Sequence, residues 1–300
     1  MKRLLKINSC EKKMLENIVK YFKLVRFAHT VFCLPFALCG FFLAVKSPEG
    51  NFTWILLVEV LLCMVFARNT AMGFNRYLDR DIDIKNPRTK VREIPAGKIS
   101  PKNALIFVII NALAFVVTTY FINQTVFFLS PVALFVVMFY SYTKRFTSLC
   151  HFVLGAGMAL APLGAYLAVT GQWALLPLMY FFLVLTWGGG FDIIYSLQDA
   201  GFDTQNNLHS VPQALGISGA LKLSAVVHVL TAVLIIVIGY MQKVGTFYAI
   251  GASIFLLLLF RQHKIVSKDD LSRVNVAFGT FNGLASVIFS IFDILDIMLS

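Results

Sequence analysis

Long uncharged apolar runs constrain this chain more than any other feature. Several stretches of eighteen or more residues carry no charged side chain, and hydrophobic residues make up 58% of the 300 positions. Runs of that length cross a bilayer as helices. They lack the strict alternation of a membrane barrel, so helices are the only spans that satisfy the backbone in lipid. The sequence therefore predicts an all-α, multi-pass membrane bundle.

The apolar runs divide the chain into about nine predicted spans, preceded by a basic amphipathic arm over residues 1–23. The transmembrane domain is expected to cover residues 24–300. The predicted spans are residues 24–45, 53–74, 103–122, 125–142, 151–170, 173–195, 219–240, 244–260 and 274–298.

The charges in the loops predict the orientation of these spans. Of the 26 Lys and Arg residues, all except Lys46 and Lys243 fall on one side of the predicted membrane. The positive-inside rule makes that side cytoplasmic, together with the N-terminus and any polar chemistry. The net charge of +11 is thus interpreted as topology and contact with anionic lipid, not as nucleic-acid binding. We expect a bacterial inner (cytoplasmic) membrane protein.

Residues 75–97 differ from the rest of the chain, because they place three aspartates and six basic residues directly after a span. Asn75, Asp79 and Asp83 recur every fourth residue, so on a helix they share one face. Such a row of oxygen ligands beside basic residues suits Mg²⁺ with a diphosphate. The alternative is a solvated helix end whose charges pair with each other, and that explains Asp81 well.

This pattern recurs 120 residues later as Tyr195, Asp199 and Asp203, again after the second span of a predicted four-span unit. We interpret the echo as duplication of a four-helix unit, giving two four-helix repeats plus one helix, with chance similarity as the alternative. Both clusters are predicted at the cytoplasmic ends of their spans.

Other polar residues stand beside these clusters. Asp192 follows three glycines inside an apolar span, where a carboxylate is usually paired or functional. The glycines indicate either close approach of a ligand or tight helix packing. The remaining candidates are predicted ligands of a diphosphate: Arg68, Arg88, Arg92, Tyr140, Lys144 and Arg145.

The motifs Asn75-x₃-Asp79-x₃-Asp83, Tyr140-x₃-Lys144-Arg145 and Asp192-x₂-Tyr195-x₃-Asp199-x₃-Asp203 together resemble the UbiA superfamily of membrane prenyltransferases. The resemblance covers roughly residues 24–290. It implies a nine-helix bundle whose two aspartate-rich motifs bind Mg²⁺ and a polyprenyl diphosphate.

Residues 26–36 and 208–212 are similar to the 4-hydroxybenzoate polyprenyltransferase branch. The resemblance implies transfer of a polyprenyl chain to an aromatic acid in respiratory quinone (ubiquinone) biosynthesis. The same residues also resemble homologues that prenylate a dihydroxynaphthoate on a menaquinone route. A secondary transporter is an alternative from a different class, because intramembrane acids and repeats occur there too.

We expect Mg²⁺ to be held by an acidic set and the proton of the acceptor to be handled by Asp192 beside Tyr195. The expected metal ligands are Asn75, Asp79, Asp83, Asp199 and Asp203.

Overall fold

The computed structural model describes residues 19–299, without the side chains of residues 27–29. The predicted arm lies mostly outside these residues. The described elements are η1 (Phe27–Phe32), α2 (Leu34–Val45), α3 (Trp54–Leu78), α4 (Arg80–Asp83), α5 (Pro101–Ile122), α6 (Gln124–Thr143), α7 (Cys150–Thr170), α8 (Leu175–Ser196), η2 (Leu197–Asp199), α9 (Ala200–Gln205), α10 (Val211–Gln242), α11 (Thr246–Ile265), η3 (Val276–Phe281) and α12 (Asn282–Leu299).

The described residues form a bundle of long helices that confirms the predicted fold class. Eight helices are long and apolar enough to cross a membrane, and the shorter apolar helix over Thr30–Val45 stands where the first of the nine spans was predicted. Where a predicted span is one helix, the structural boundaries fall within five residues of the predicted ones, except that α10 begins at Val211, eight residues early, and has a kink at Gly216. The first predicted span is divided into η1 and α2, and the last into η3 and α12. The chain is an integral membrane protein.

Helix starts follow from local sequence. Thr53, Ser100, Asn123 and Ser210 each accept a hydrogen bond from a backbone N–H of the first turn that they cap, in α3, α5, α6 and α10 respectively. Such caps satisfy N–H groups that a helix leaves unpaired.

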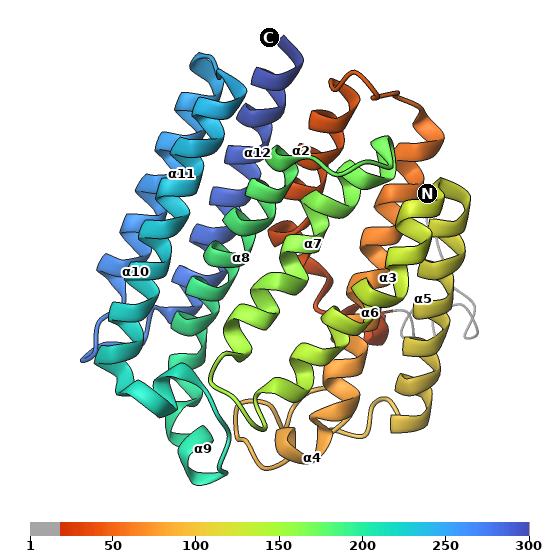
Figure 1. Cartoon of the computed structure of the whole chain (residues 1–300). Helices are drawn as coiled ribbons and strands as arrows, with labels where there is room; N and C mark the ends of the chain where they lie inside the picture. The colour runs from red at the N-terminus through yellow and green to blue at the C-terminus, as the bar shows by residue number, and fades with distance from the viewer. Residues whose placement is uncertain (1–18, 300) are drawn as a thin grey trace, which may run out of the picture.

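The short helices α4 and α9 lie at the same end of the bundle (Figure 1). Each follows a long helix, α4 after α3 and α9 after α8, as the predicted repeat requires. The two aspartate clusters are therefore brought to one end, although they are far apart in the sequence.

Helices α7 and α8 approach closely because glycines face each other between them. A Cβ built on Gly155 would lie 2.4 Å from the backbone oxygen of Leu185, and one on Gly188 would lie 3.3 Å from the Gly155 Cα. Gly190 packs on α10 in the same way, since a Cβ there would lie 2.3 Å from the His228 ring. Of the two interpretations of the three glycines before Asp192, the structure favours tight helix packing. None of the three lines the cavity described below.

Candidate functional site

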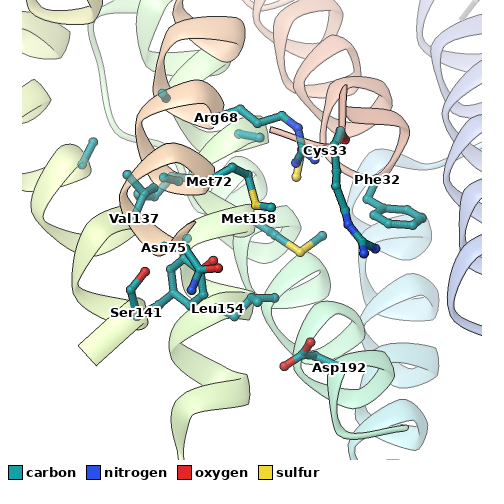
Figure 2. Close-up of a pocket in the computed structure, with 18 of the residues that line it drawn as sticks. Phe32, Cys33, Arg68, Met72, Asn75, Val137, Ser141, Leu154, Met158 and Asp192 are labelled. Atoms are coloured by element: carbon teal, nitrogen blue, oxygen red, sulfur yellow. Dashed lines mark hydrogen bonds between the residues drawn. The ribbon is translucent and has the colours of Figure 1, made fainter. Parts of the chain in front are cut away.

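A cavity of about 540 Å³ lies among α3, α6, α7 and α8. Figure 2 shows Arg68, Met72 and Asn75 of α3 and Asp192 of α8 around this space. Twelve of the thirteen predicted site residues line it: Arg68, Asn75, Asp79, Asp83, Arg88, Arg92, Tyr140, Lys144, Arg145, Asp192, Tyr195 and Asp199.

The first aspartate cluster sits where the helix breaks. Helix α3 ends at Leu78, and Asp79 is its C-cap, with φ −86° and ψ 2°. Asn75 donates from Nδ2 to Asp79 Oδ2 at 2.9 Å. Asp83 closes the single turn α4 and is buried. The three residues still face one cavity, although they do not share a continuous helix.

Each of the four predicted metal-binding aspartates forms an ion pair with an Arg or Lys side chain. In the first cluster, Arg145 Nη2 lies 3.2 Å from Asp79 Oδ1, and Arg92 Nη1 donates to both oxygens of Asp83 at 2.7 and 2.8 Å.

The second cluster repeats this arrangement. Arg88 Nε donates to Asp199 Oδ1 at 3.0 Å while its Nη2 contacts Oδ2, and Lys144 Nζ lies 2.7 Å from Asp203 Oδ1. The two clusters therefore pair four carboxylates with four cations at one end of the cavity, which we call its mouth.

The electrostatics of the mouth are set by burial and by these pairs. Burial and the neighbouring Asp83 raise the pKa of Asp79, against the effect of Arg145. For Lys144 burial works to lower the pKa, but the adjacent Asp203 outweighs it and the pKa lies above its ordinary value. A cation added at this end would relieve the crowding of carboxylates around Asp79.

Asp203 is the one predicted site residue that does not line the cavity. Its side chain is fully buried, and Lys144, which does line the cavity, stands against it. In this arrangement Asp203 anchors the ammonium group of Lys144. Asp81, which the sequence analysis places in solvent, is 80% exposed and lies 3.6 Å from Arg80.

Arg88 also connects the ionic mouth to an aromatic wall. Its Nη1 donates to the hydroxyl of Tyr195 at 3.1 Å. The ring of Phe278 stacks on Tyr195 with centroids 4.1 Å apart. Phe278 belongs to η3, a π-helical turn, and such turns frequently occur at functional sites.

Asp192 is held from behind by a histidine that sequence reasoning missed. His151 Nδ1 lies 2.7 Å from Asp192 Oδ2. His151 is the second residue of α7 and is buried, whereas the side chain of Asp192 is 19% exposed toward the cavity. The two residues are 41 positions apart, so no sequence spacing indicated the contact.

Arg68 occupies a different position from the other predicted diphosphate ligands. It lies seven residues before Asn75 on α3, about 10 Å deeper along the helix axis. Its Nη2 donates to the backbone oxygen of Arg26 at 3.1 Å, and its buried Nε has no hydrogen-bond partner among the described residues. In the described part of the chain no carboxylate forms an ion pair with it.

The cavity lining also includes polar residues that were not predicted, among them Arg26, Arg76, Asn86 and His151. Arg76 is buried and donates to Asn75 Oδ1 at 2.9 Å, and Asn86 donates to Asp199 Oδ1 at 3.1 Å. Two sequence signals could have identified them: Arg76 stands beside the first motif, and Asn86 lies within the charged stretch.

The donor set fits Mg²⁺ in type. Carboxylate and amide oxygens are the ligands that hard divalent cations take. Within residues 19–299 no three Asp, Glu, His or Cys side chains converge on one point. Each aspartate is instead paired with a basic residue, and basic residues are the groups that a diphosphate would attract.

These features define a helical integral membrane protein with an ionic mouth on an apolar cavity, suited to a polyanion with a long hydrophobic tail. The UbiA prenyltransferase family matches residues 33–286. The chain belongs to that family and is a prenyltransferase. The transporter alternative does not agree with this membership.

Similar proteins are found among bacterial enzymes. The chain is 26% identical to 4-hydroxybenzoate octaprenyltransferase of Francisella tularensis subsp. mediasiatica (strain FSC147), over 78% of this chain and 82% of that protein. It is 27% identical to the enzyme of the same name from Tolumonas auensis, over 74% and 78% respectively.

Solved structures share the fold. An apo UbiA homologue from Aeropyrum pernix K1 superimposes with a TM-score of 0.81 at 28% identity, covering 89% of this chain and 98% of that one. A UbiA homologue from Archaeoglobus fulgidus bound to DMAPP and Mg²⁺ gives a TM-score of 0.71 at 20% identity, covering 94% and 100%.

Proposed function

We propose that this chain transfers a polyprenyl group from a polyprenyl diphosphate to an acidic aromatic acceptor, in a Mg²⁺-dependent reaction of respiratory quinone biosynthesis. The observation that carries the proposal is the cavity itself, which joins an ionic mouth to an apolar interior. Between the two it holds Arg68, whose buried Nε has no hydrogen-bond partner among the described residues.

The mouth suits a diphosphate and its metal. Asn75, Asp79, Asp83 and Asp199 face the cavity and would hold Mg²⁺, with Asp203 acting through Lys144. When bound, Mg²⁺ would neutralise charge on the leaving diphosphate. The paired bases would turn to the phosphate oxygens: Arg88, Arg92, Lys144 and Arg145.

The apolar interior suits a long prenyl chain. Along α7 the cavity is lined by residues between Cys150 and Ala168, which are about 27 Å apart along the helix. That length is close to the hydrocarbon thickness of a bilayer, about 30 Å. Relatives named octaprenyltransferase agree with a long donor.

Arg68 supports an acceptor that carries a carboxylate. A guanidinium inside a membrane helix is costly, and such groups are usually matched by an opposite charge. Because Arg68 lies deeper than the bases of the mouth, an anion separate from the diphosphate is its best match. An aromatic acid such as 4-hydroxybenzoate supplies that charge on a ring small enough to fit beside Asp192.

In the proposed reaction the allylic C–O bond breaks and its electron pair leaves with the diphosphate. Arg88 and Lys144 stabilise the charge that develops there. A ring carbon next to the acceptor hydroxyl forms the new C–C bond while the hydroxyl proton passes to Asp192. The ring then regains aromaticity by moving its displaced hydrogen to the oxygen. Tyr195 and Phe278 would present aromatic faces to the allylic cation.

The names of the relatives favour 4-hydroxybenzoate over a dihydroxynaphthoate. The test supplies both acceptors together with a long polyprenyl diphosphate and Mg²⁺ to purified protein, and identifies the product by mass spectrometry. Prenylated 4-hydroxybenzoate is expected. Consumption of the donor without a prenylated aromatic acid would contradict the proposal.

We also propose that the mouth faces the cytoplasm of a bacterial inner membrane, as the loop charges predict. Cysteine labelling supports this if a cysteine replacing exposed Lys90 reacts only from the cytoplasmic side, and one replacing exposed Trp173 only from the other.

A further inference from the structure

His151 makes two hydrogen bonds, and together they determine where its proton resides. Its Nε2 lies 3.2 Å from the backbone nitrogen of Val211, the first residue of α10. A backbone N–H can only donate, so Nε2 accepts and carries no proton. A neutral imidazole then carries its proton on Nδ1, which donates to Asp192 Oδ2 at 2.7 Å.

This hydrogen bond leaves the two oxygens of Asp192 with different surroundings. Oδ2 is occupied by His151, while Oδ1 has no hydrogen-bond partner within the described residues. The His151 side chain is 3% exposed and stands behind the carboxylate, whose own side chain is 19% exposed. Asp192 is therefore fixed from the protein interior and open on the side of the cavity.

Val211, whose N–H donates to His151, belongs to a segment that several other contacts hold in place. His209 N–H donates to the backbone oxygen of Lys144 at 2.8 Å, and Cys150 Sγ lies 3.6 Å from the backbone oxygen of His209. Ser210 caps α10 through the N–H of Gln213. These contacts hold Val211 in place, so that His151 has a fixed support on the side away from Asp192.

We propose that His151 is a positioning residue for prenyl transfer: as the Nδ1–H tautomer it holds Asp192 by Oδ2, so that Oδ1 faces the hydroxyl of the acceptor. The inference rests on the proposed function, in which Asp192 receives the hydroxyl proton. In this role His151 acts through Asp192. A misplacement of a reacting group by about 1 Å can lower a rate by about 100-fold.

Two substitutions separate this role from simple support of α10. Asn ends its side chain at the distance of Nδ1, so His151→Asn keeps a donor to Asp192 and loses the acceptor for Val211. Gln reaches the distance of Nε2, so His151→Gln keeps an acceptor for Val211 and loses the donor to Asp192. The measurements are kcat and the KM of both substrates, with Tm as a check on folding.

We expect His151→Gln to lower kcat by about 10- to 100-fold, with the KM of the polyprenyl diphosphate within about twofold of wild type. His151→Asn should stay within about fivefold of the wild-type kcat. The opposite ranking would mean that support of α10 is the only role and would overturn the proposal. Equal loss in both variants would overturn it as well.

A double-mutant cycle tests whether His151 acts through Asp192. The variant carrying both Asp192→Asn and His151→Gln should be no more than about twofold slower than Asp192→Asn alone. Independent, multiplying losses would contradict the proposed coupling.

Imidazole ¹⁵N NMR of the full-length protein gives a measurement without turnover. The chain has 5 histidines, so the signal of His151 is assigned by its loss in His151→Asn. A protonated Nδ1 with an unprotonated Nε2 is expected, and a proton on Nε2 would overturn the inference. If the wild-type protein prenylates no aromatic acid, the proposed function is wrong. The NMR measurement still tests the hydrogen bonds of His151, because it does not depend on turnover.

Discussion

Arg88 joins the two halves of the ionic mouth to each other, because its Nε donates to Asp199 Oδ1 at 3.0 Å across 111 positions of sequence. Arg88 comes from the charged stretch after α4, and Asp199 ends η2 beyond α8. One guanidinium thus links the two aspartate-rich segments and also reaches Tyr195. The contact makes the two segments one site.

Arg88→Ala should remove a cation that binds the diphosphate and, at the same time, the ion pair that links the two aspartate-rich segments. We expect kcat to fall by about 100- to 1,000-fold, the size of loss seen when one preorganised donor to a developing anion is removed. Steady-state kinetics with the polyprenyl diphosphate measures it. Lys90→Ala is the matched control, because Lys90 lies two residues away in the same loop and is exposed. Equal losses in both variants would argue against a specific role for Arg88.

Removing the metal should stop the reaction. With EDTA in excess, product formation is expected to fall to background and to return when Mg²⁺ is restored. Asp83→Asn should raise the Mg²⁺ concentration needed for half-maximal rate, because a buried carboxylate ligand is lost. Asp81→Asn, at an 80% exposed side chain, should leave that concentration unchanged. Full activity in EDTA would show that the aspartates only form ion pairs with basic residues and bind no catalytic metal.

Arg68→Gln should weaken binding of the acidic acceptor in particular. A charge-assisted hydrogen bond contributes about 1.5–3 kcal/mol, so the KM of the aromatic acid should rise by about 10- to 100-fold. The KM of the polyprenyl diphosphate should change little, because the bases of the mouth remain. With the neutral methyl ester of the same acceptor, wild type and variant should behave alike. A rise in the KM of the diphosphate instead would make Arg68 a diphosphate ligand, as predicted from the sequence.

Gly164→Phe should shorten the donors that the enzyme accepts. Gly164 lines the cavity, and a Cβ built there meets no atom within 4 Å, so the new ring would enter the open passage. The position is fourteen residues beyond Cys150, about 21 Å along α7. We expect kcat/KM for a long polyprenyl diphosphate to fall at least about tenfold, with geranyl diphosphate little affected. Leu113→Phe on the exposed face of α5 is the control. Unchanged use of long donors would place their tails elsewhere.

Gly155→Ala should destabilise the bundle. The added Cβ would lie 2.4 Å from the backbone oxygen of Leu185, which cannot move without shifting α8. Overpacking of this kind costs about 1–3 kcal/mol. Thermal unfolding in detergent should show a lower Tm than wild type. Gly164→Ala, on the same helix with open space around its Cβ, should leave the Tm unchanged or higher.

Much of the fold was predictable because its signals are local. A helix in lipid must satisfy its own backbone, so apolar runs such as those at 103–122 and 151–170 marked α5 and α7 to within two residues. Polar residues in such a chain are costly, and for that reason Asn75, Asp79 and Asp192 were recognisable as site candidates without a structure.

Partners between distant helices were not predictable, because they depend on how the helices pack. Nothing in the spacing of His151 and Asp192 indicates a contact, and the burial of Asp203 behind Lys144 follows from where α9 returns to the bundle. The three glycines allowed two interpretations, and only the packing of α7 against α8 decides between them. Sequence periodicity and hydropathy determined which residues belong to the membrane and which to its polar end. Tertiary packing alone decided which charged residues form ion pairs. An ion pair requires two side chains to lie within a few ångströms of each other, and most of these partners are separated by tens of residues in the sequence.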